Sequence, residues 1–285
     1  MMPQATPPHP DPRKVVLITG CSSGIGYDAA HGLRARGWRV FASCRHPDDC
    51  ARLHAEGFES PQLDVDDSSS ISRAVAEVLA ATGGRLDALY NNAGYGLPAL
   101  VEDLPRQALR DMFETNLFGP HELTRRVIPV MRAQGHGRIV WCSSVLGLVG
   151  YRWRGAYGAT KFAMEGLVDI LRLELQNDPI HVSLIEPGPV TSAFRIKSQK
   201  RFEQGINWQS SARRADYAPI IDRLYNKTGK DPFELPASSV TKALVHALES
   251  PRPRRRYFVT VPTWIAVICR RILPVWLVDR IMLRL

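Results

Sequence analysis

A glycine-rich turn near the start of the chain joins a short apolar segment, residues 14–19, to a helical segment, residues 27–36. The turn carries Gly20, Gly24 and Gly26 in the spacing G-x-x-x-G-x-G. Glycines at such a junction let the backbone turn sharply and approach a pyrophosphate, and the free N–H groups at the start of the next helix attract its negative charge. The strand before the turn and the helix after it favour nucleotide binding over an ordinary strand-to-helix connection.

Apolar runs and helical stretches then alternate along the chain, which predicts a parallel sheet with helices on both faces. The expected strands are residues 15–19, 39–43, 61–64, 88–91, 138–143, 181–186 and 257–261. Residues 105–134 and 154–175 have helical periodicity, and Phe162, Leu167, Ile170 and Leu171 form the expected core stripe of the second stretch. A chain of 285 residues with 45% hydrophobic content suits one core, so we expect a single-domain, doubly wound α/β fold of the Rossmann type.

The two ends of the chain differ from this central region, residues 14–262. Residues 1–13 are rich in proline and lack the apolar run of a signal peptide, which predicts a disordered tail. Residues 263–285 mix apolar residues and tryptophans with arginines, and Pro274 interrupts them, so they fall short of the roughly 20 apolar residues of a spanning helix. We expect an amphipathic helical extension that contacts a membrane interface, a subunit neighbour or the substrate mouth.

The net charge of +9 raises the question of an acidic partner. No recognisable module interleaves basic with aromatic residues, so we expect no nucleic-acid partner. The five cysteines show no metal-ligand spacing, and their odd number suits a reducing compartment. We therefore expect no metal site and a cytoplasmic protein, with membrane association left open.

Tyr157 and Lys161 form a candidate acid/base pair, because positions i and i+4 of a helix share a face. A free tyrosine has a pKa of about 10, and an adjacent ammonium group lowers it towards neutrality. Ser144 lies thirteen residues upstream, and no Gly-x-Ser-x-Gly elbow surrounds it, which argues against a nucleophilic serine. The Tyr-x-x-x-Lys spacing alone also occurs on many solvated helix faces, so its weight comes from the motifs around it.

Several motifs in one order give this chain a resemblance to the short-chain dehydrogenase/reductase family, within which it looks most similar to bacterial NADP-dependent aldehyde reductases and to retinol and hydroxysteroid dehydrogenases. The matching segments are Thr19 to Gly26, Asp64 in Leu-Asp-Val, Asn91-Asn-Ala-Gly94, Asn116, Ser144, Tyr157 with Lys161, and Pro187-Gly-Pro-Val-Thr191. The resemblance implies carbonyl reduction by hydride and proton transfer. Ser144 then binds the substrate carbonyl, Tyr157 donates the proton, Lys161 holds the nicotinamide ribose and Asn116 anchors a water chain.

The end of the second strand bears on the choice of cofactor. Arg45 follows Cys44 at the place where an acidic residue would bind the ribose 2′-hydroxyl of NAD, and a planar arginine suits the 2′-phosphate of NADP. The alternative is that Arg45 only solvates a strand end. We predict NADP(H), with a partial grip on the phosphate, because Ser22 and Ser23 do not supply the basic residue that many NADP-dependent members carry in the turn.

The resemblance also assigns the remaining cofactor contacts. Asp64 and Val65 are expected at the adenine, although Asp64 is alternatively a helix cap before Ser68. The full set of expected cofactor residues is Gly20, Ser22, Ser23, Gly24, Ile25, Gly26, Arg45, Asp64, Val65, Asn92, Ala93, Gly94, Asn116, Tyr157, Lys161, Pro187, Gly188, Val190 and Thr191.

Asn116 lies inside a helical stretch, and Pro120 follows four positions later. Because proline lacks an N–H and its ring crowds the carbonyl of residue i−4, the Asn116 carbonyl loses its helical partner and can accept a bond from water. Alternatively, Pro120 begins a second helix and Asn116 caps the first.

By resemblance, residues 192–235 are the variable segment over the substrate, which we name the lid segment. It carries Phe194, Phe202, Trp208, Tyr217 and Tyr225, which either clamp an apolar substrate or only pack against the body of the protein. The leading hypothesis is an NADP(H)-dependent oxidoreductase of a lipophilic aldehyde or ketone, in a homo-oligomer as is common in the family. The alternatives are a nucleotide-binding scaffold without turnover and a relative that catalyses epimerisation or elimination.

Overall fold

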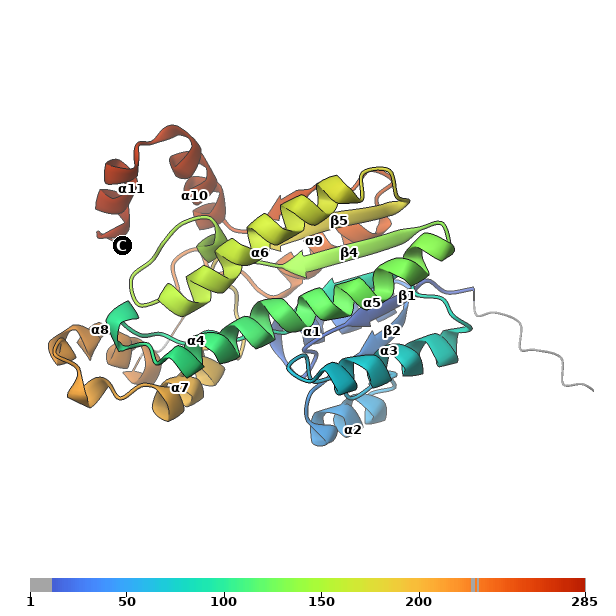
Figure 1. Ribbon diagram of the computed structural model, residues 1–285, viewed down its shortest axis with the longest axis horizontal. Helices are drawn as coiled ribbons and strands as arrows, with labels where there is room; N and C mark the ends of the chain where they lie inside the picture. Colours follow the sequence, from blue (N-terminus) through green and yellow to red (C-terminus); the bar gives the residue numbers. More distant parts are fainter. Residues whose placement is uncertain (1–11, 227–228, 230, 285) are drawn as a thin grey trace, which may run out of the picture.

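A six-stranded parallel sheet forms the centre of the protein in the computed structural model, which describes residues 12–226, 229 and 231–284 (Figure 1). The sequence predicts disorder for residues 1–13. Of these, residues 1–11 lie outside the described residues. The strand order is β2-β1-β3-β4-β5-β6. The chain places β2 on one side of β1 and then adds β3 to β6 on the other side. The strands are Val15–Ile18 (β1), Arg39–Ala42 (β2), Ala88–Asn91 (β3), Gly137–Cys142 (β4), Ile180–Glu186 (β5) and Arg256–Phe258 (β6).

Six of the expected strands are present, and the expectation of a strand at residues 61–64 is wrong. Gln62 forms only an isolated bridge with Cys44, and the Leu63 N–H donates to the Cys44 carbonyl over 2.8 Å. Pro61 has no N–H to contribute to a ladder, so the segment follows β2 without pairing along its length.

Helices cover both faces of the sheet, as the alternating pattern predicted. One face packs against α3 (Ser68–Thr82), α5 (Gly119–Ala133) and α6 (Gly155–Glu174), and the buried Trp141 belongs to this layer. The other face packs against α1 (Gly24–Ala35) and α9 (Ser238–Glu249), with α2 (Pro47–Ala55) beside them. The expected doubly wound α/β fold is therefore confirmed.

The core stripe expected on α6 is partly wrong. Phe162 is 36% exposed and Ile170 is 55% exposed, whereas Met164 and Val168 are each 1% exposed. The buried face of α6 also carries Thr160 and Lys161, both polar, so hydrophobic periodicity alone pointed to the neighbouring face. Leu167 and Leu171 do pack, half-buried, against the core.

The long helical stretch at residues 105–134 contains a wider turn. Helix α4 (Arg106–Phe113) leads into a π-helical turn, η2 (Glu114–Phe118), and then into α5. Pro120 lies in the first turn of α5, where its missing N–H leaves the hydrogen bonding before it irregular. Gly119 is required here because a Cβ atom would lie 2.0 Å from the Val65 carbonyl oxygen.

The lid segment and the C-terminal helices lie at the end of the sheet to which the strand arrow of β4 points in Figure 1. The lid segment contains α7 (Phe194–Gly205), η4 (Trp208–Ser210), η5 (Arg214–Tyr217), α8 (Ala218–Ile221) and η6 (Asp222–Asn226). After β6 the chain forms α10 (Val261–Ile272) and α11 (Val275–Met282), the C-terminal helix pair. Two short 3₁₀ turns, η1 (Val101–Asp103) and η3 (Val145–Gly147), complete the elements.

Pro274 separates the two helices of the C-terminal pair, because proline ends one helix and is accepted at the start of the next. Both helices carry apolar residues on one side and arginines on another, which confirms the expected amphipathic extension. Within the described part of the chain, none of the helices combines the length and the apolar character needed to cross a bilayer.

Candidate active site

A cavity of about 1360 Å³ opens at the carboxyl ends of the strands, between the sheet, the lid segment and the C-terminal helix pair. The crevice of a doubly wound sheet lies at this edge, where the strand order reverses. Every predicted site residue lines the cavity except Gly26 and Asn116, which lie behind its wall. The sequence motifs thus converge in space.

The glycine turn lies in the conformation that its sequence predicted. Gly20 and Gly24 have φ angles of +74° and +63°, which residues with a Cβ rarely adopt. A Cβ on Gly26 would lie 2.5 Å from both Asn92 Nδ2 and the Gly20 carbonyl oxygen. The Asn92 side-chain amide in turn donates to the Thr19 carbonyl over 2.9 Å, so its role in this structure is to hold the turn.

Helix α1 begins at Gly24 without a side-chain cap, because the Ser23 hydroxyl accepts no cap hydrogen bond. Its first N–H groups therefore remain available at the cavity wall, where the helix dipole favours an anion. A close-approach glycine turn, an uncapped helix start and a deep crevice together fit a dinucleotide.

Arg45 and Asp64 lie on the rim of the crevice. Arg45 is solvent exposed, and its guanidinium lies 3.2 Å from the Nε2 atom of His46. The Asp64 carboxylate accepts from the Asp66 N–H over 3.1 Å, whereas Asp67 caps α3 by accepting from the Ser69 N–H over 2.8 Å. Asp64 is therefore not the helix cap, which leaves its carboxylate at the cavity wall.

Tyr157 and Lys161 lie on one face of α6, as their spacing predicted. The Lys161 ammonium lies 5.6 Å from the centre of the Tyr157 ring and donates to the Cys142 carbonyl over 2.7 Å. The Ser144 Oγ atom accepts from the Leu146 N–H over 3.2 Å and faces the same cavity. Phe194 meets the Tyr157 ring edge-on, with 5.4 Å between the ring centres.

Burial has the largest effect on the pKa values of Tyr157 and Lys161. Burial raises the pKa of Tyr157 well above its ordinary value, while a hydrogen bond with Ser144 and the charge of Arg154 act in the opposite direction. Burial also lowers the pKa of Lys161. The structure thus gives a raised pKa for Tyr157 in place of the expected lowering, because desolvation of the phenol is the largest cause.

Asn116 is fully buried and braces helix α6. Its side-chain carbonyl accepts from the Tyr95 N–H, and its amide donates to the Tyr95 carbonyl and to Thr160 Oγ1, each over 3.0 Å. The Thr160 hydroxyl donates to the Tyr157 carbonyl over 2.8 Å. The π turn therefore aims Asn116 at the turn of α6 that carries Tyr157.

The loop after β5 crosses the middle of the cavity. The Pro187 carbonyl accepts from the Val145 N–H over 2.8 Å, which ties this loop to η3 beside Ser144. A Cβ on Gly188 would lie 2.1 Å from Thr260 Oγ1, so only glycine fits. The Thr191 hydroxyl donates to the Glu234 carboxylate over 2.6 Å, which joins the loop to the end of the lid segment.

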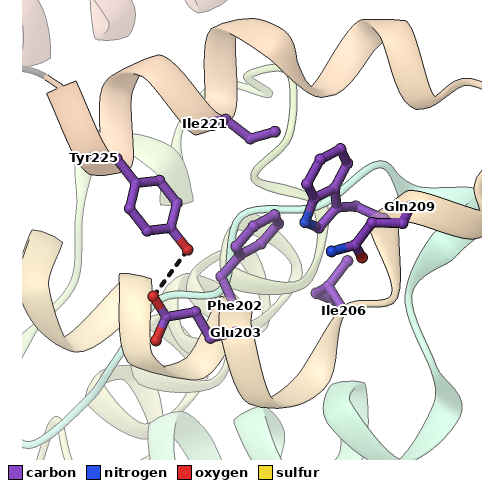
Figure 2. Close-up of a pocket in the computed structure, with 7 residues that line it drawn as sticks. Phe202, Glu203, Ile206, Gln209, Ile221 and Tyr225 are labelled. Atoms are coloured by element: carbon purple, nitrogen blue, oxygen red, sulfur yellow. Dashed lines mark hydrogen bonds between the residues drawn. The ribbon is translucent and has the colours of Figure 1, made fainter.

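The aromatic residues of the lid segment divide into two groups. Phe194 lines the main cavity beside Tyr157, whereas Tyr217 is fully buried and donates from its hydroxyl to Asp103 over 2.7 Å. Phe202, Trp208 and Tyr225 line a separate, smaller cavity of about 380 Å³ within the lid segment. Figure 2 shows this cavity, with the Tyr225 hydroxyl bonded to Glu203 over 2.9 Å.

Three groups of cavity residues were not identified from the sequence. Arg154 lies at the start of α6, and burial lowers its pKa to about 10, with the charge of Arg223 as the next cause. Lys197 reaches the glycine turn from α7. The inner face of α11 supplies Val278, Ile281 and Met282, whose i, i+3, i+4 spacing was the one sequence signal available.

A cluster of charged residues connects α6 with β5 and β6. Arg256 of β6 forms ion pairs with Glu165 and Asp169 of α6 and, over 2.9 Å, with Glu186 of β5. Burial raises the pKa of Glu186 to about 8, the charge of Glu165 adds to this, and Arg256 opposes it. The guanidinium thereby joins β5, β6 and α6.

Residues 14–202 match the family described as short chain dehydrogenase. The chain is 40% identical over 270 residues to the uncharacterized oxidoreductase YbbO of Escherichia coli K12, and the match covers 95% of this chain and 94% of the relative. It is 36% identical to retinol dehydrogenase 8 of Bos taurus, covering 86% and 82% of the two chains. It is 34% identical to human 17-beta-hydroxysteroid dehydrogenase type 1, covering 87% and 78%.

Solved structures show the same fold. A short-chain dehydrogenase from Streptomyces avermitilis is 30% identical, with a TM-score of 0.75 over 90% of this chain and 92% of the other. A Burkholderia phymatum enzyme in complex with NAD is 25% identical, with a TM-score of 0.74 and the same coverage. Serine dehydrogenase complexed with NADP⁺ is 26% identical, with a TM-score of 0.72 over 86% and 94% of the chains.

Proposed function

Since the chain belongs to the short-chain dehydrogenase family and is an oxidoreductase that uses a nicotinamide cofactor, we propose that it interconverts an aldehyde or ketone with its alcohol and that its cofactor is NADP(H). The observation that carries the proposal is the position of Ser144, Tyr157 and Lys161 on one wall of the cavity, beside the glycine turn. Proton donor and cofactor crevice thereby share one enclosed space.

Tyr157 is the proposed acid/base. Burial keeps its phenol protonated near neutral pH, so in the reducing direction it can donate a proton to the substrate oxygen. Ser144 orients that oxygen, and Lys161 is the proposed partner of the nicotinamide ribose. When bound, the nicotinamide cofactor supplies or accepts the hydride. Asn116 holds Thr160 and thereby the turn that carries Tyr157, and we keep the proposal that its main-chain carbonyl anchors a water chain.

Arg45 supports the preference for NADP(H). It stands after β2 on the crevice rim, where the sequence has Cys44 and no acidic residue. An arginine at this place suits a 2′-phosphate, whereas NAD-binding sites commonly use a carboxylate for the 2′-hydroxyl. Both cofactors occur among the structural relatives, so direct binding measurements decide between them.

We propose a lipophilic substrate, such as a long-chain aldehyde, retinal or a steroid-like ketone. The cavity lining includes the apolar residues Val149, Phe194, Ile265 and Met282. Two of the relatives are named for retinol and for a hydroxysteroid, which agrees with such a wall. Arg154 is the cation nearest in sequence to Tyr157 on that wall and suits a polar group of the substrate.

The test is an NADPH consumption assay over long-chain aldehydes, retinal and steroid ketones, with Tyr157→Phe as the matched variant. Loss of the proton donor should lower kcat by about 10²- to 10⁴-fold while NADPH binding stays within about twofold of wild type. Wild-type protein that binds NADPH and turns over none of these carbonyls would support a nucleotide-binding scaffold. Product formed without net cofactor consumption would support epimerisation or elimination.

We further propose a cytoplasmic homo-oligomer that contacts membranes peripherally. Ile170 and Leu173 of α6 are more than half exposed, which supports a contact with another copy of the chain. Light scattering of the purified protein tests this: a monomer at all concentrations would contradict it.

A further inference from the structure

Lys197 connects the lid segment to the glycine turn across the cavity. It lies in the first turn of α7, and its ammonium donates to the Ser22 hydroxyl over 3.3 Å. The two residues are 175 positions apart in the sequence. Ser22 belongs to the turn that the dinucleotide approaches, so the contact brings a cation of the lid segment to the cofactor side of the crevice.

Arg45 and Asp49 also line the crevice here. Burial is the largest cause that lowers the pKa of Lys197, and the positive charge of Arg45 adds to it, whereas the charge of Asp49 acts in the opposite direction. Asp49 is itself bonded to Arg52 over 3.3 Å. Among the described residues, neither Lys197 nor Arg45 forms a salt bridge. Two cations from different elements therefore line the same crevice, and Lys197 reaches the glycine turn through a neutral hydroxyl.

We propose that Lys197 and Arg45 together hold the 2′-phosphate of NADP(H), so that the lid segment supplies the cation that the glycine turn lacks. This inference rests on the proposed preference for NADP(H). A phosphate monoester carries between one and two negative charges near neutral pH and accepts several charge-assisted hydrogen bonds, so it pairs with both cations and removes their repulsion. NAD(H) carries a neutral hydroxyl at this position, so it does not reduce the repulsion between the two cations.

The position of Lys197 links the phosphate to the substrate side of the cavity. Phe194 lies one helical turn before Lys197 on α7 and contacts the Tyr157 ring. A phosphate that fixes Lys197 therefore also fixes the side chain that packs on the catalytic tyrosine. Helix α7 therefore both contacts the phosphate that distinguishes NADP(H) from NAD(H) and lines the substrate cavity.

The experiment uses two fragments that differ by the phosphate alone, adenosine 2′,5′-bisphosphate and adenosine 5′-monophosphate. Calorimetry measures both with wild type, Lys197→Met and Arg45→Met, and with Lys242→Met as a control for loss of an exposed lysine far from the cavity. We expect Lys197→Met and Arg45→Met each to weaken the bisphosphate about tenfold and the monophosphate less than twofold. Lys242→Met should change neither, and Lys197→Arg should restore most of the bisphosphate affinity.

Hydrogen exchange of residues 194–205 provides a second readout that is independent of activity. The bisphosphate should protect this helix in wild type and not in Lys197→Met, while the monophosphate should protect it in neither. Equal weakening of both fragments by Lys197→Met, or unchanged affinity for both, overturns the inference. If wild type itself binds the two fragments equally, the NADP(H) preference fails; if wild type discriminates and Lys197→Met discriminates as well, only the role of Lys197 fails.

Discussion

Tyr157 illustrates how an enclosed site changes the expected effect of a neighbouring charge. The sequence places Lys161 one turn away, and a cation so close predicts a lowered pKa. In the structure the ammonium lies beside the ring face and bonds to the Cys142 carbonyl, while the phenol loses water on burial. Desolvation favours the neutral phenol over the phenolate, so near neutral pH the residue carries a proton that it can donate.

This protonation state predicts an asymmetric pH dependence. With Tyr157 as the proposed proton donor, reduction needs the neutral phenol, so kcat/KM for reduction should be constant from about pH 6 to pH 9. Oxidation needs the phenolate, whose fraction grows about tenfold per pH unit below the pKa, so kcat/KM for alcohol oxidation should rise over the same range. Rate profiles in both directions, at saturating cofactor, measure this. An oxidation rate that levels off near pH 7 would instead show that Lys161 lowers the pKa in the loaded enzyme.

At the level of elements, Arg256 joins β5, β6 and α6. Its guanidinium pairs with Glu165, Asp169 and Glu186, of which Glu186 is fully buried. Removal of the cation leaves buried carboxyl groups without the hydrogen bonds and the positive charge that the guanidinium supplies, which is far more costly than loss of a surface pair. The cluster therefore holds α6, the helix that carries Tyr157 and Lys161, against the sheet.

Arg256→Met should accordingly lower the free energy of unfolding by about 3–5 kcal/mol. Arg255→Met, at the exposed neighbouring position, should change it by less than about 0.5 kcal/mol. Urea unfolding followed by circular dichroism compares the two variants at pH 7. A similarly small change for both would mean that the buried carboxyls are satisfied by protonation without Arg256.

The elements were predictable where local pattern and tertiary environment agree. β3 has the expected bounds and four further strands lie within one residue of theirs, because buried apolar runs have no stable alternative beside a helix layer, whereas β6 ends three residues earlier than expected. The segment at residues 61–64, Pro-Gln-Leu-Asp, lies beside the end of β2, but a strand also needs a partner ladder, to which Pro61 cannot contribute an N–H. Pairing of this kind cannot be read from the segment itself.

The buried face of a helix was less predictable where polar residues of the candidate site occupy it. On α6 the buried side carries Thr160 and Lys161, so the apolar stripe seen in the sequence lay one face away. Pro120 in contrast gave a correct local signal, since the irregular turn just before it orients Asn116. The site residues that belong to motifs could be found; Arg154, Lys197 and the α11 wall depend on contacts between distant segments.

On the scale of the whole molecule, the C-terminal helix pair has an inner and an outer face. Val278, Ile281 and Met282 face the cavity, while Ile272, Val275 and Trp276 are between 64% and 76% exposed. Arg271, Arg280 and Arg284 are exposed on the same pair of helices. Exposed apolar residues with arginines nearby are typical of helices that lie in the interface of an anionic bilayer.

The protein should therefore sediment with vesicles that contain phosphatidylglycerol and only weakly with vesicles of phosphatidylcholine alone. The double substitution Ile272→Glu and Trp276→Glu should weaken this partition by about tenfold or more, because it removes apolar burial and adds negative charge. Leu173→Glu, at the far end of α6, is the control and should leave partition unchanged. Equal sedimentation of the double variant and wild type would contradict a membrane contact through this surface.

The C-terminal helix pair also follows the last strand of the sheet, so the nucleotide crevice is complete before this segment begins. The wall that it contributes is thus an appended module: exchanging everything after Thr260 between members of the family would transfer a preference for one carbonyl compound over another without rebuilding the grip on the dinucleotide. In such a scaffold, a change of the C-terminal segment alone can alter substrate preference, while the residues around the dinucleotide crevice stay the same.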